Sequence, residues 1–576
     1  MQPDPIAPLR GEPGAPGTAI GPLWTLDLTP SQPATGATGQ ASGTKGQASG
    51  ASGPVAGRPI SGDDAVRALA ETAAALEQMA AVRRSHGEAE SAEILSMQAV
   101  MALDPALSEA VRSAAASLSG QPAGGERVGL DALLAAGESQ AAALAAIPDE
   151  YLAARAADIR DVVARAARTL TGDRLKLPSA PVILIGEDLP PSVSTEIPRE
   201  RLMGIALRGG SRTAHAVILA RAAGIPCIVA TSGLAVDGSL DGAMGLLNGE
   251  EGLLTLNPND ELLSEARRGA SAQSERRAAW EQLRGQTPKN AQGAPIHLLA
   301  NIGSQEDAAR AVRVGAAGVG LLRTEFALLN RQAPPSEAEL TEGLTTIFKH
   351  FSPGTPITLR LADIGGDKEI PYLKIPPEQN PFLGIRGYRL AMVADRPDLR
   401  ALFQNQVAAA LRAAASTGVR LKIMAPMITL RPEVDDLLAL VADARRDLAA
   451  RGEGSSAAYP AEIGIMVEVP AAALTVDLLA PGLNFISVGT TDLTQSTAAA
   501  DRTNAALAGF QDASSPAVIS LIRRAYEAAT RAGLEVGVCG ELAGTVAGAR
   551  LLAELGLTEL SMEPAAIDEV RAQLLG

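Results

Sequence analysis

Cysteine, aromatic side chains and basic charge are all scarce in this sequence, and each shortage excludes a class of protein. Only two cysteines, Cys227 and Cys539, occur in 576 residues. They lie too far apart in sequence to suggest a disulfide framework or a metal-ligand cluster, and they favour a reducing compartment. The net charge of -15 disfavours a nucleic-acid partner, which requires a basic face to neutralise phosphates, but would steer in a basic protein.

Long apolar runs and a targeting segment are missing as well. No stretch is apolar for long enough to cross a bilayer, so we expect no membrane insertion. The start, MQPDPIAPLRGEPG, lacks the basic residues and apolar core of a signal peptide, and we expect a cytoplasmic protein. Aromatics are 2% and hydrophobic residues 46% of the chain, a globular composition in which helices pack through small residues.

The first third of the chain contains two contrasting stretches. Residues 29–57 are rich in Gly, Ser, Thr, Ala and Pro and cannot offset the entropy of ordering by burial, so we expect a flexible insertion. Residues 58–170 instead repeat apolar residues at helical spacing, for example Val66, Leu69 and Leu76. This pattern predicts an all-helical unit.

From residue 171 onward the apolar pattern shortens. The runs PVILIG, MGIAL, CIVAT and MGLLN are separated by Gly and Pro, which predicts a small α/β domain. The stretch from Asn259 to Gly285 carries charges on all sides, as a solvated connector helix between domains does.

The remaining residues, 291–576, alternate short apolar runs with helical patterns. Eight runs are strand candidates: IHLLANI, GVGLLRTE, PITLRLAD, LKIMAPM, IGIMVEVP, NFISVGTTD, EVGVCGE and ELSM. Alternating strands and helices imply parallel right-handed crossovers, and eight such units predict a (β/α)8 TIM barrel. Barrel enzymes carry their chemistry where the strands end at the C-terminal face.

Charged residues and one cysteine follow these strand candidates where a barrel would place its site. They are Arg323 and Glu325, Arg360 and Asp363, Glu468, Asp492, and Cys539 with Glu541. For a single Arg or Asp, a salt bridge closing the barrel top is the commoner explanation. Convergence of the whole set on one face favours a functional site.

The chemistry of this set suits a small anion and a divalent cation. Arg323, Arg360, Lys368 and Arg502 would bind phosphate or carboxylate. The carboxylates of Glu468 and Asp492 suit Mg2+, which takes one or two carboxylates and completes its shell with water and substrate oxygens. Arginines with Mg2+ around an anion indicate phosphoryl transfer.

Two further residues admit both an ordinary and a chemical interpretation. Most cysteines are small buried hydrophobic residues, but Cys539 follows a strand and is a candidate acid, because a thiol titrates close to neutrality. His215 lies in GGSRTAHAVILARAAG, in the first turn of a predicted helix whose free N–H groups would stabilise a phosphoryl group on the imidazole. Considered alone, His215 would more simply be a structural histidine.

Motifs along nearly the whole chain outside residues 29–57 resemble the Enzyme I family of the bacterial sugar phosphotransferase system, the phosphoenolpyruvate-protein phosphotransferases. They are GEPGAPGTAIGPL, DEYLAARAADIRDV, GSRTAH, GAAGVGLLRTEF, ADIGGDKEIPYL, NPFLGIRGYR, GIMVEVPAAA, ISVGTTDLTQ and VCGELAG, in that order. So many long motifs in one order are improbable by chance.

The resemblance implies a multidomain α/β architecture with a swivelling phosphohistidine domain. Its segments would be an opening strand region (1–28), the insertion (29–57), a helical subdomain that binds the carrier protein HPr (58–170), the phosphohistidine α/β domain (171–256), a connector helix (257–290), and a TIM barrel that binds phosphoenolpyruvate and forms a homodimer (291–576).

The resemblance also implies a role for each matching residue. His215 would be phosphorylated and Cys539 would donate a proton. Arg323, Arg360 and Arg502 would bind the substrate anion, while Glu468 and Asp492 would bind Mg2+. The product would be pyruvate, because the enolate left by loss of the phosphoryl group must be protonated on carbon.

The sequence departs from the family pattern at several positions. Thr491, at a position whose side chain would contact the substrate phosphate, stands where the family has Asn. Ser496 stands where Tyr is usual, and Leu361 where Thr is usual. Ser211 and Ala214 replace a Gly and a Ser in the histidine motif. We expect an active enzyme of reduced rate.

Two alternative functions stay open on the sequence. A relative of the dikinases would share the histidine domain and the barrel but needs an ATP-grasp domain, and no stretch here is long or Gly/Lys-rich enough for one. A catalytically impaired sensor of phosphoenolpyruvate that regulates partners is motivated by Thr491 and the altered histidine motif.

Overall fold

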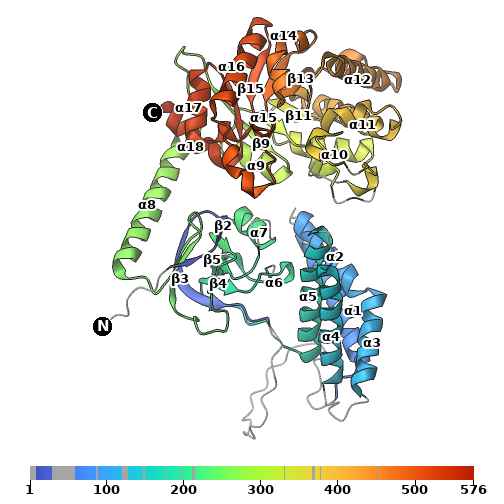
Figure 1. Ribbon diagram of the computed structural model, residues 1–576, viewed down its shortest axis with the longest axis vertical. Coiled ribbons are helices and arrows are strands. Elements are labelled where there is room, and N and C mark those ends of the chain that lie inside the picture. The colour runs from blue at the N-terminus through green and yellow to red at the C-terminus, as the bar shows by residue number, and fades with distance from the viewer. Residues whose placement is uncertain are drawn as a thin grey trace. The chain divides into compact units, whose positions relative to one another are not determined.

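The computed structural model describes most of the chain, as two compact units. The described residues are 8–28, 59–85, 89–119, 127–146, 150–173, 175–194, 196–210, 215–329, 331, 333–365, 370–376, 378–452 and 454–576. The compact units are residues 1–272 and 273–576 (Figure 1). The predicted insertion, residues 29–57, lies outside the described residues.

The first unit contains an eight-stranded mixed sheet in the order β1-β8-β7-β3-β4-β5-β6-β2. Strands β3 to β6 are parallel neighbours and the others pair antiparallel. The strands are β1 (Leu9–Arg10), β2 (Glu12–Ala15), β3 (Thr18–Thr25), β4 (Val182–Gly186), β5 (Leu202–Leu207), β6 (Cys227–Val229), β7 (Met244–Asn248) and β8 (Leu253–Leu256).

Side chains of the central strand β4 alternate between two apolar cores. Leu184 belongs to the core on one face, whereas Ile183 and Ile185 belong to the core on the other. Burial on both faces explains why β4 is apolar without interruption, as a central parallel strand should be. The four strands predicted within residues 171–256 are confirmed, and β8 was missed because LLTL is short and follows a turn.

Five helices between β3 and β4 form the predicted all-helical unit, with an apolar core of their own. They are α1 (Gly62–Ser85), α2 (Ala89–Ala102), α3 (Pro105–Ser119), α4 (Val128–Ala145) and α5 (Glu150–Thr171). Polar contacts join this unit to the sheet domain: the Ser192 hydroxyl, in α6 (Pro191–Ser194), donates to Asp161 of α5 at 2.7 Å.

Helix α8 (Asp260–Gln282) follows the sheet and has no buried residue. Its charged side chains therefore remain solvated, as the sequence predicts for this stretch. Within the described part of the chain, no single helix is long and apolar enough to cross a membrane; one pair of helices, Ile94–Ala102 and Pro105–Ser119, meets the length and composition test jointly but is bent by 43°.

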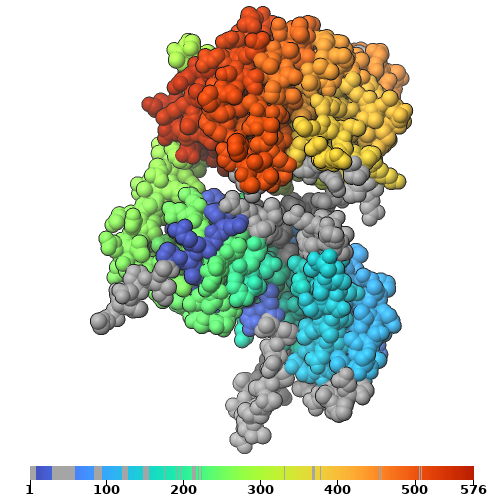
Figure 2. All heavy atoms as spheres, viewed as in Figure 1, coloured from blue at the N-terminus to red at the C-terminus, as the bar shows by residue number. Residues whose placement is uncertain are grey.

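The second unit is a closed barrel of eight parallel strands, which confirms the predicted TIM barrel. Its atoms run from green through yellow to red in Figure 2. The strands are β9 (His297–Ile302), β10 (Val319–Leu322), β11 (Pro356–Arg360), β12 (Arg420–Ala425), β13 (Glu462–Val467), β14 (Phe485–Val488), β15 (Glu535–Val538) and β16 (Glu559–Met562).

Helices follow the barrel strands and cover them through one large apolar core. They are α9 (Gln305–Arg313), α10 (Glu337–Phe348), α11 (Pro397–Thr417), α12 (Arg431–Ala450), α13 (Pro470–Leu474), α14 (Val476–Leu479), α15 (Thr490–Ala498), α16 (Pro516–Arg531), α17 (Val546–Glu554) and α18 (Pro564–Leu575). Since every strand runs the same way, all eight C-terminal ends open on one face.

Candidate active site

A cavity of about 660 Å³ lies at the C-terminal face of the barrel strands. Seven residues predicted from the sequence line it: Arg323, Arg360, Glu468, Thr491, Asp492, Arg502 and Cys539. Of the other two predicted site residues, Lys368 lies outside the described residues and His215 belongs to the first compact unit. The strand ends therefore bring together side chains separated by more than 200 residues in sequence.

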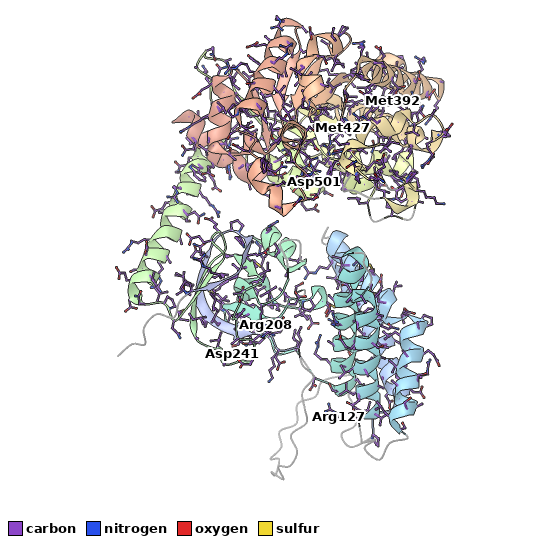
Figure 3. The ribbon with its side chains drawn as sticks, viewed as in Figure 1. Arg127, Arg208, Asp241, Met392, Met427 and Asp501 are labelled. Atoms are coloured by element: carbon purple, nitrogen blue, oxygen red, sulfur yellow. The ribbon has the colours of Figure 1, made fainter. Side chains whose placement is uncertain are left out.

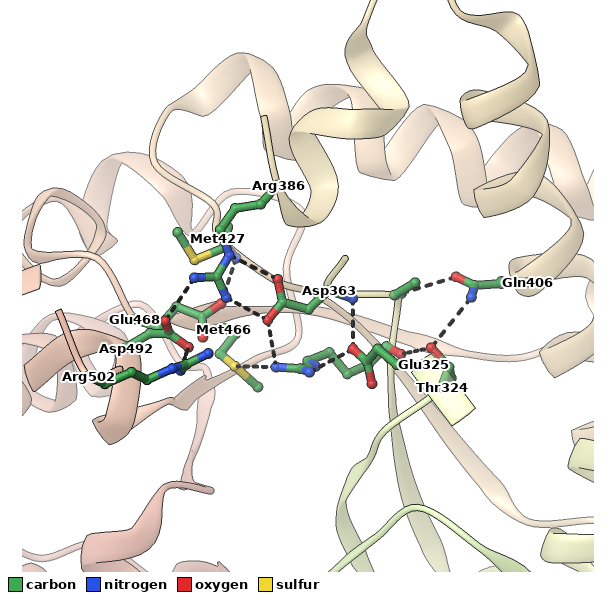
Figure 4. A network of polar contacts seen from close by, with 12 residues as sticks. Thr324, Glu325, Asp363, Arg386, Gln406, Met427, Met466, Glu468, Asp492 and Arg502 are labelled. Carbon is green, nitrogen blue, oxygen red and sulfur yellow. Dashed lines mark hydrogen bonds and ion pairs between the residues drawn. The ribbon is translucent and has the colours of Figure 1, made fainter. Parts of the chain in front are cut away.

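Arg360, the last residue of β11, is buried and held by the carboxylates of Glu325 and Asp363, both labelled in Figure 4. Its Nη2 donates to Glu325 Oε1 at 2.7 Å, and its Nη1 lies 3.3 Å from Asp363 Oδ2. Burial alone would lower the pKa of Arg360, but these two carboxylates outweigh burial and the pKa is raised. Arg360 is thus a permanent cation at the cavity wall.

Arg386 was missed by the sequence analysis and bridges two acidic residues of the site. Its Nη2 donates to Asp363 Oδ2 at 2.9 Å and its Nη1 to Asp492 Oδ1 at 3.0 Å. The side chain is 1% exposed, so these two carboxylates, rather than water, stabilise its positive charge. NPFLGIRGYR was recognised as a family motif, but it lies in the irregular stretch between β11 and α11, where no strand end indicates what the side chain reaches.

The two other predicted arginines also pair with acidic groups. Arg502 Nη1 lies 3.3 Å from Asp492 Oδ2, and Arg323 Nη1 lies 3.3 Å from Glu563 Oε1. Both are more exposed than Arg360, so these pairs are weaker and more easily exchanged for another anion.

Glu468 follows β13 directly and is 1% exposed. Its Oε1 accepts a hydrogen bond from the backbone N–H of Met427 at 2.6 Å, and Met427 is labelled in Figure 3. Burial, followed by repulsion from Asp492 and Asp363, raises the pKa of Glu468. Two carboxylates that repel each other beside a cavity are suitable oxygen ligands for a hard cation.

The carboxylate pair does not by itself form a complete metal cage. Within the described ranges of the chain, no group of three or more His, Cys, Asp and Glu side chains could hold a metal ion. A cation bound by Glu468 and Asp492 would need oxygens from water or from a bound ligand, which is the way Mg2+ is usually held.

Cys539 follows β15 directly, and its side chain is buried at the cavity wall. Burial raises the pKa of the thiol to about 11, although the Ser487 hydroxyl lowers it. The thiol is therefore protonated at neutral pH. The sequence-based expectation that it titrates close to neutrality does not take this burial into account. The residue after Cys539 must be a glycine, Gly540, because a Cβ at this position would lie 1.9 Å from Thr490 Oγ1.

His215 is the first residue of α7 (His215–Ala223), in agreement with the prediction that it lies in the first turn. Residues 211–214 of the motif lie outside the described residues. Gly210, with φ of 85°, adopts a left-handed conformation before the helix. Arg221 of α7 donates from Nε to the Gly14 carbonyl at 2.6 Å, which links the helix to the strand β2.

The barrel and its cavity define the chain as a (β/α)8 enzyme whose site combines arginines, carboxylates and a thiol. Two family models match the sequence: "PEP-utilising enzyme, PEP-binding domain" over residues 277–576 and "PEP-utilising enzyme, mobile domain" over residues 178–252. The first match covers the entire barrel, and the second covers β4 to β7 and α7, the helix that begins with His215.

Curated relatives indicate which family of PEP-utilising enzymes the chain belongs to. A phosphoenolpyruvate-protein phosphotransferase of Geobacillus stearothermophilus is 38% identical over 432 residues, covering 74% of this chain and 73% of the relative. One of Haloferax volcanii is 40% identical, covering 73% and 72%. A multiphosphoryl transfer protein of Xanthomonas campestris is 41% identical, covering 76% and 51%. The chain belongs to the phosphoenolpyruvate-protein phosphotransferase family of PEP-utilising enzymes.

Proposed function

We propose that this chain is a cytoplasmic phosphoenolpyruvate-protein phosphotransferase: it takes the phosphoryl group of phosphoenolpyruvate onto His215, releases pyruvate and passes the phosphoryl group to HPr for sugar uptake. The observation that carries the proposal is the barrel cavity. Its walls combine the arginines Arg323, Arg360 and Arg502 with several carboxylates, among them Glu468 and Asp492, and a thiol. Arginine binds both phosphate and carboxylate, the two anionic groups of phosphoenolpyruvate.

Substrate binding would exchange the arginines' carboxylate partners for substrate oxygens. Arg323 and Arg502 each hold one carboxylate at 3.3 Å in a partly exposed pair, so this exchange leaves neither cation without a partner. Lys368 would add a further positive charge. Thr491 offers one hydroxyl donor where the family pattern has an amide with two, so we expect a weaker hold on the phosphate and a slower enzyme.

Glu468 and Asp492 would hold Mg2+. The fit rests on their chemistry: both are carboxylates at the cavity wall, and mutual repulsion favours a cation between or beside them. When bound, Mg2+ would stabilise negative charge that develops on the substrate oxygens.

The reaction would begin with attack of a His215 ring nitrogen on phosphorus. The bond between phosphorus and the enol oxygen breaks, and its electron pair stays on that oxygen as an enolate. Cys539 Sγ–H then gives its proton to the terminal carbon, which forms pyruvate and leaves a thiolate to be reprotonated by water. The free N–H groups at the start of α7 would stabilise the phosphoryl group on His215.

Two protein partners complete the proposal. HPr would dock on the helical unit, where Val100 and Leu103 expose apolar surface at the end of α2. A second copy of the chain would pack against the barrel. Exposed apolar side chains in the segments that follow the consecutive strands β11 to β14 support this homodimer: Leu383, Leu430, Leu474, Leu478 and Phe510.

Labelling with phosphoenolpyruvate that carries a radioactive phosphate tests the function against its alternatives. We expect label on the protein in the presence of Mg2+ and phosphoenolpyruvate, and none from labelled ATP. Labelling by ATP would favour the dikinase-type relative. Binding of phosphoenolpyruvate without label or pyruvate would favour the impaired sensor, which Thr491 motivates.

The raised pKa of Glu468 predicts that Mg2+ binding depends on pH. Below its pKa Glu468 carries a proton, which the metal must displace, so Mg2+ affinity should fall as pH falls. The same raised pKa means that the metal-free folded chain gains a proton relative to the unfolded chain, so its stability declines as pH rises through this range.

Thermal unfolding with and without Mg2+ measures this dependence. We expect the rise in Tm caused by Mg2+ to be larger at about pH 8.5 than at about pH 6.5. In Glu468→Gln, which has no titratable group at this position, the Mg2+ effect should be small at both pH values. A wild-type Mg2+ effect that is equal at both would contradict the prediction.

A further inference from the structure

The carbonyl of Cys539 lies just beyond the end of a barrel ladder. The last pair of residues between β15 and β16 is Val538 with Leu560. The next carbonyl therefore needs another donor, because a buried C=O without a hydrogen bond is costly. The side chain of Asn301 provides it: Nδ2 donates to the Cys539 carbonyl at 3.0 Å.

Asn301 is itself fixed by a second hydrogen bond. It sits in β9 and is 4% exposed. Its Oδ1 accepts from the Ser561 hydroxyl of β16 at 2.6 Å. Only one orientation of the amide satisfies both contacts, since the oxygen must face Ser561 and the nitrogen must face Cys539.

The interior of the barrel makes room for this arrangement. A Cβ on Gly320 of β10 would lie 2.4 Å from Cβ and Oγ of Ser561. Glycine in the GVGLL run therefore allows Ser561 to reach Asn301. The chain of hydrogen bonds spans the neighbouring strands β9, β16 and β15 and ends on the backbone of Cys539, which lines the cavity together with Asn301.

We propose that Asn301 is a positioning residue that, oriented by Ser561, fixes the backbone of Cys539 and so aims its thiol at the terminal carbon of the substrate. The inference rests on the proposed role of Cys539 as proton donor. Beyond the end of β15 the backbone of Cys539 is held on one side by its N–H bond to the Val488 carbonyl at 3.0 Å and on the other by Asn301. Without Asn301, the carbonyl of Cys539 would lose its hydrogen bond and the backbone at this residue could move.

Two assays of proton transfer test the proposal in the full chain. One is the steady-state rate of pyruvate formation from phosphoenolpyruvate with HPr and Mg2+. The other is NMR measurement of deuterium entering the methyl group of pyruvate in D2O with Mg2+. In this exchange the Cys539 thiol first loses its proton to solvent, and the thiolate then removes a methyl proton from pyruvate. The thiol formed in this way exchanges with D2O, and a deuteron returns to the enolate. Because the exchange needs no phosphoryl transfer, it does not depend on His215.

We expect Asn301→Ala to lower kcat and the exchange rate together by about tenfold to a hundredfold, with KM changed by less than about threefold. Ser561→Ala should lower both rates less, by about threefold to tenfold. The matched control is Asn484→Ala, because Asn484 also bonds the backbone of a neighbouring strand, accepting from the Ile463 N–H at 2.8 Å, but lies before β14 at the opposite end of the barrel. This variant should retain both rates.

Comparison with Cys539→Ala distinguishes an error in the proposed proton donor from an error in the positioning role of Asn301. If Cys539→Ala keeps both rates, the proposed proton donor is wrong. If Cys539→Ala loses them while Asn301→Ala keeps them, only the positioning role is overturned. If Asn301→Ala does not fold, as judged by its melting curve, Ser561→Ala decides: unchanged kcat and exchange in that variant would overturn the proposal.

Discussion

Replacement of His215 by alanine is expected to abolish labelling of the protein by phosphoenolpyruvate, to below about 0.1% of the wild-type extent. The imidazole is the proposed nucleophile, and alanine has no atom that could accept the phosphoryl group. The measurement is incorporation of radioactive phosphate from phosphoenolpyruvate in the presence of Mg2+.

The matched control for this substitution is His297→Ala. His297 is exposed and begins β9, at the end of the barrel opposite the cavity. It should label like the wild type, and both variants should still bind phosphoenolpyruvate, since the proposed substrate ligands are in the barrel. Equal labelling of His215→Ala and the wild type would show that the phosphoryl group is carried elsewhere.

Replacement of Cys539 by alanine should reduce pyruvate formation by about a hundredfold to ten-thousandfold, the usual contribution of a positioned acid. Its thiol is protonated at neutral pH because burial raises the pKa to about 11. Without it the enolate must take its proton from water. Binding of phosphoenolpyruvate, measured by calorimetry, should change by less than about twofold, because the thiol carries no charge that would attract the substrate.

Cys227→Ala is the control for Cys539→Ala. It removes the other buried cysteine of the chain, which lies in β6 of the sheet domain. We expect this variant to form pyruvate at the wild-type rate once its melting temperature confirms that it is folded. A Cys539→Ala enzyme as fast as Cys227→Ala would exclude the thiol as the acid.

The barrel and most of its site could be predicted from sequence for a physical reason. Parallel strands end on one face of the barrel. A polar residue that directly follows an apolar run can therefore be placed at this face from the sequence alone. Arg323, Arg360, Glu468 and Cys539 all follow or end a strand in this way. The structure places all four on one cavity wall.

Residues outside this pattern could not be predicted from it. Arg386 reaches the site from an irregular stretch, and only its ion pairs with Asp363 and Asp492 reveal it. Asn301 does lie near the end of a predicted strand, but its importance depends on its hydrogen bond to the carbonyl of Cys539, more than 200 residues away. The protonation state of Cys539 likewise depends on burial, which composition does not indicate.

Transfer of phosphate from phosphoenolpyruvate to purified HPr, with and without Mg2+, tests the central claim most directly. We predict that the wild-type chain labels HPr and releases pyruvate only with Mg2+, and that His215→Ala labels neither itself nor HPr. Labelling of HPr by His215→Ala, or failure of the phosphorylated wild-type chain to label HPr at all, would contradict the account.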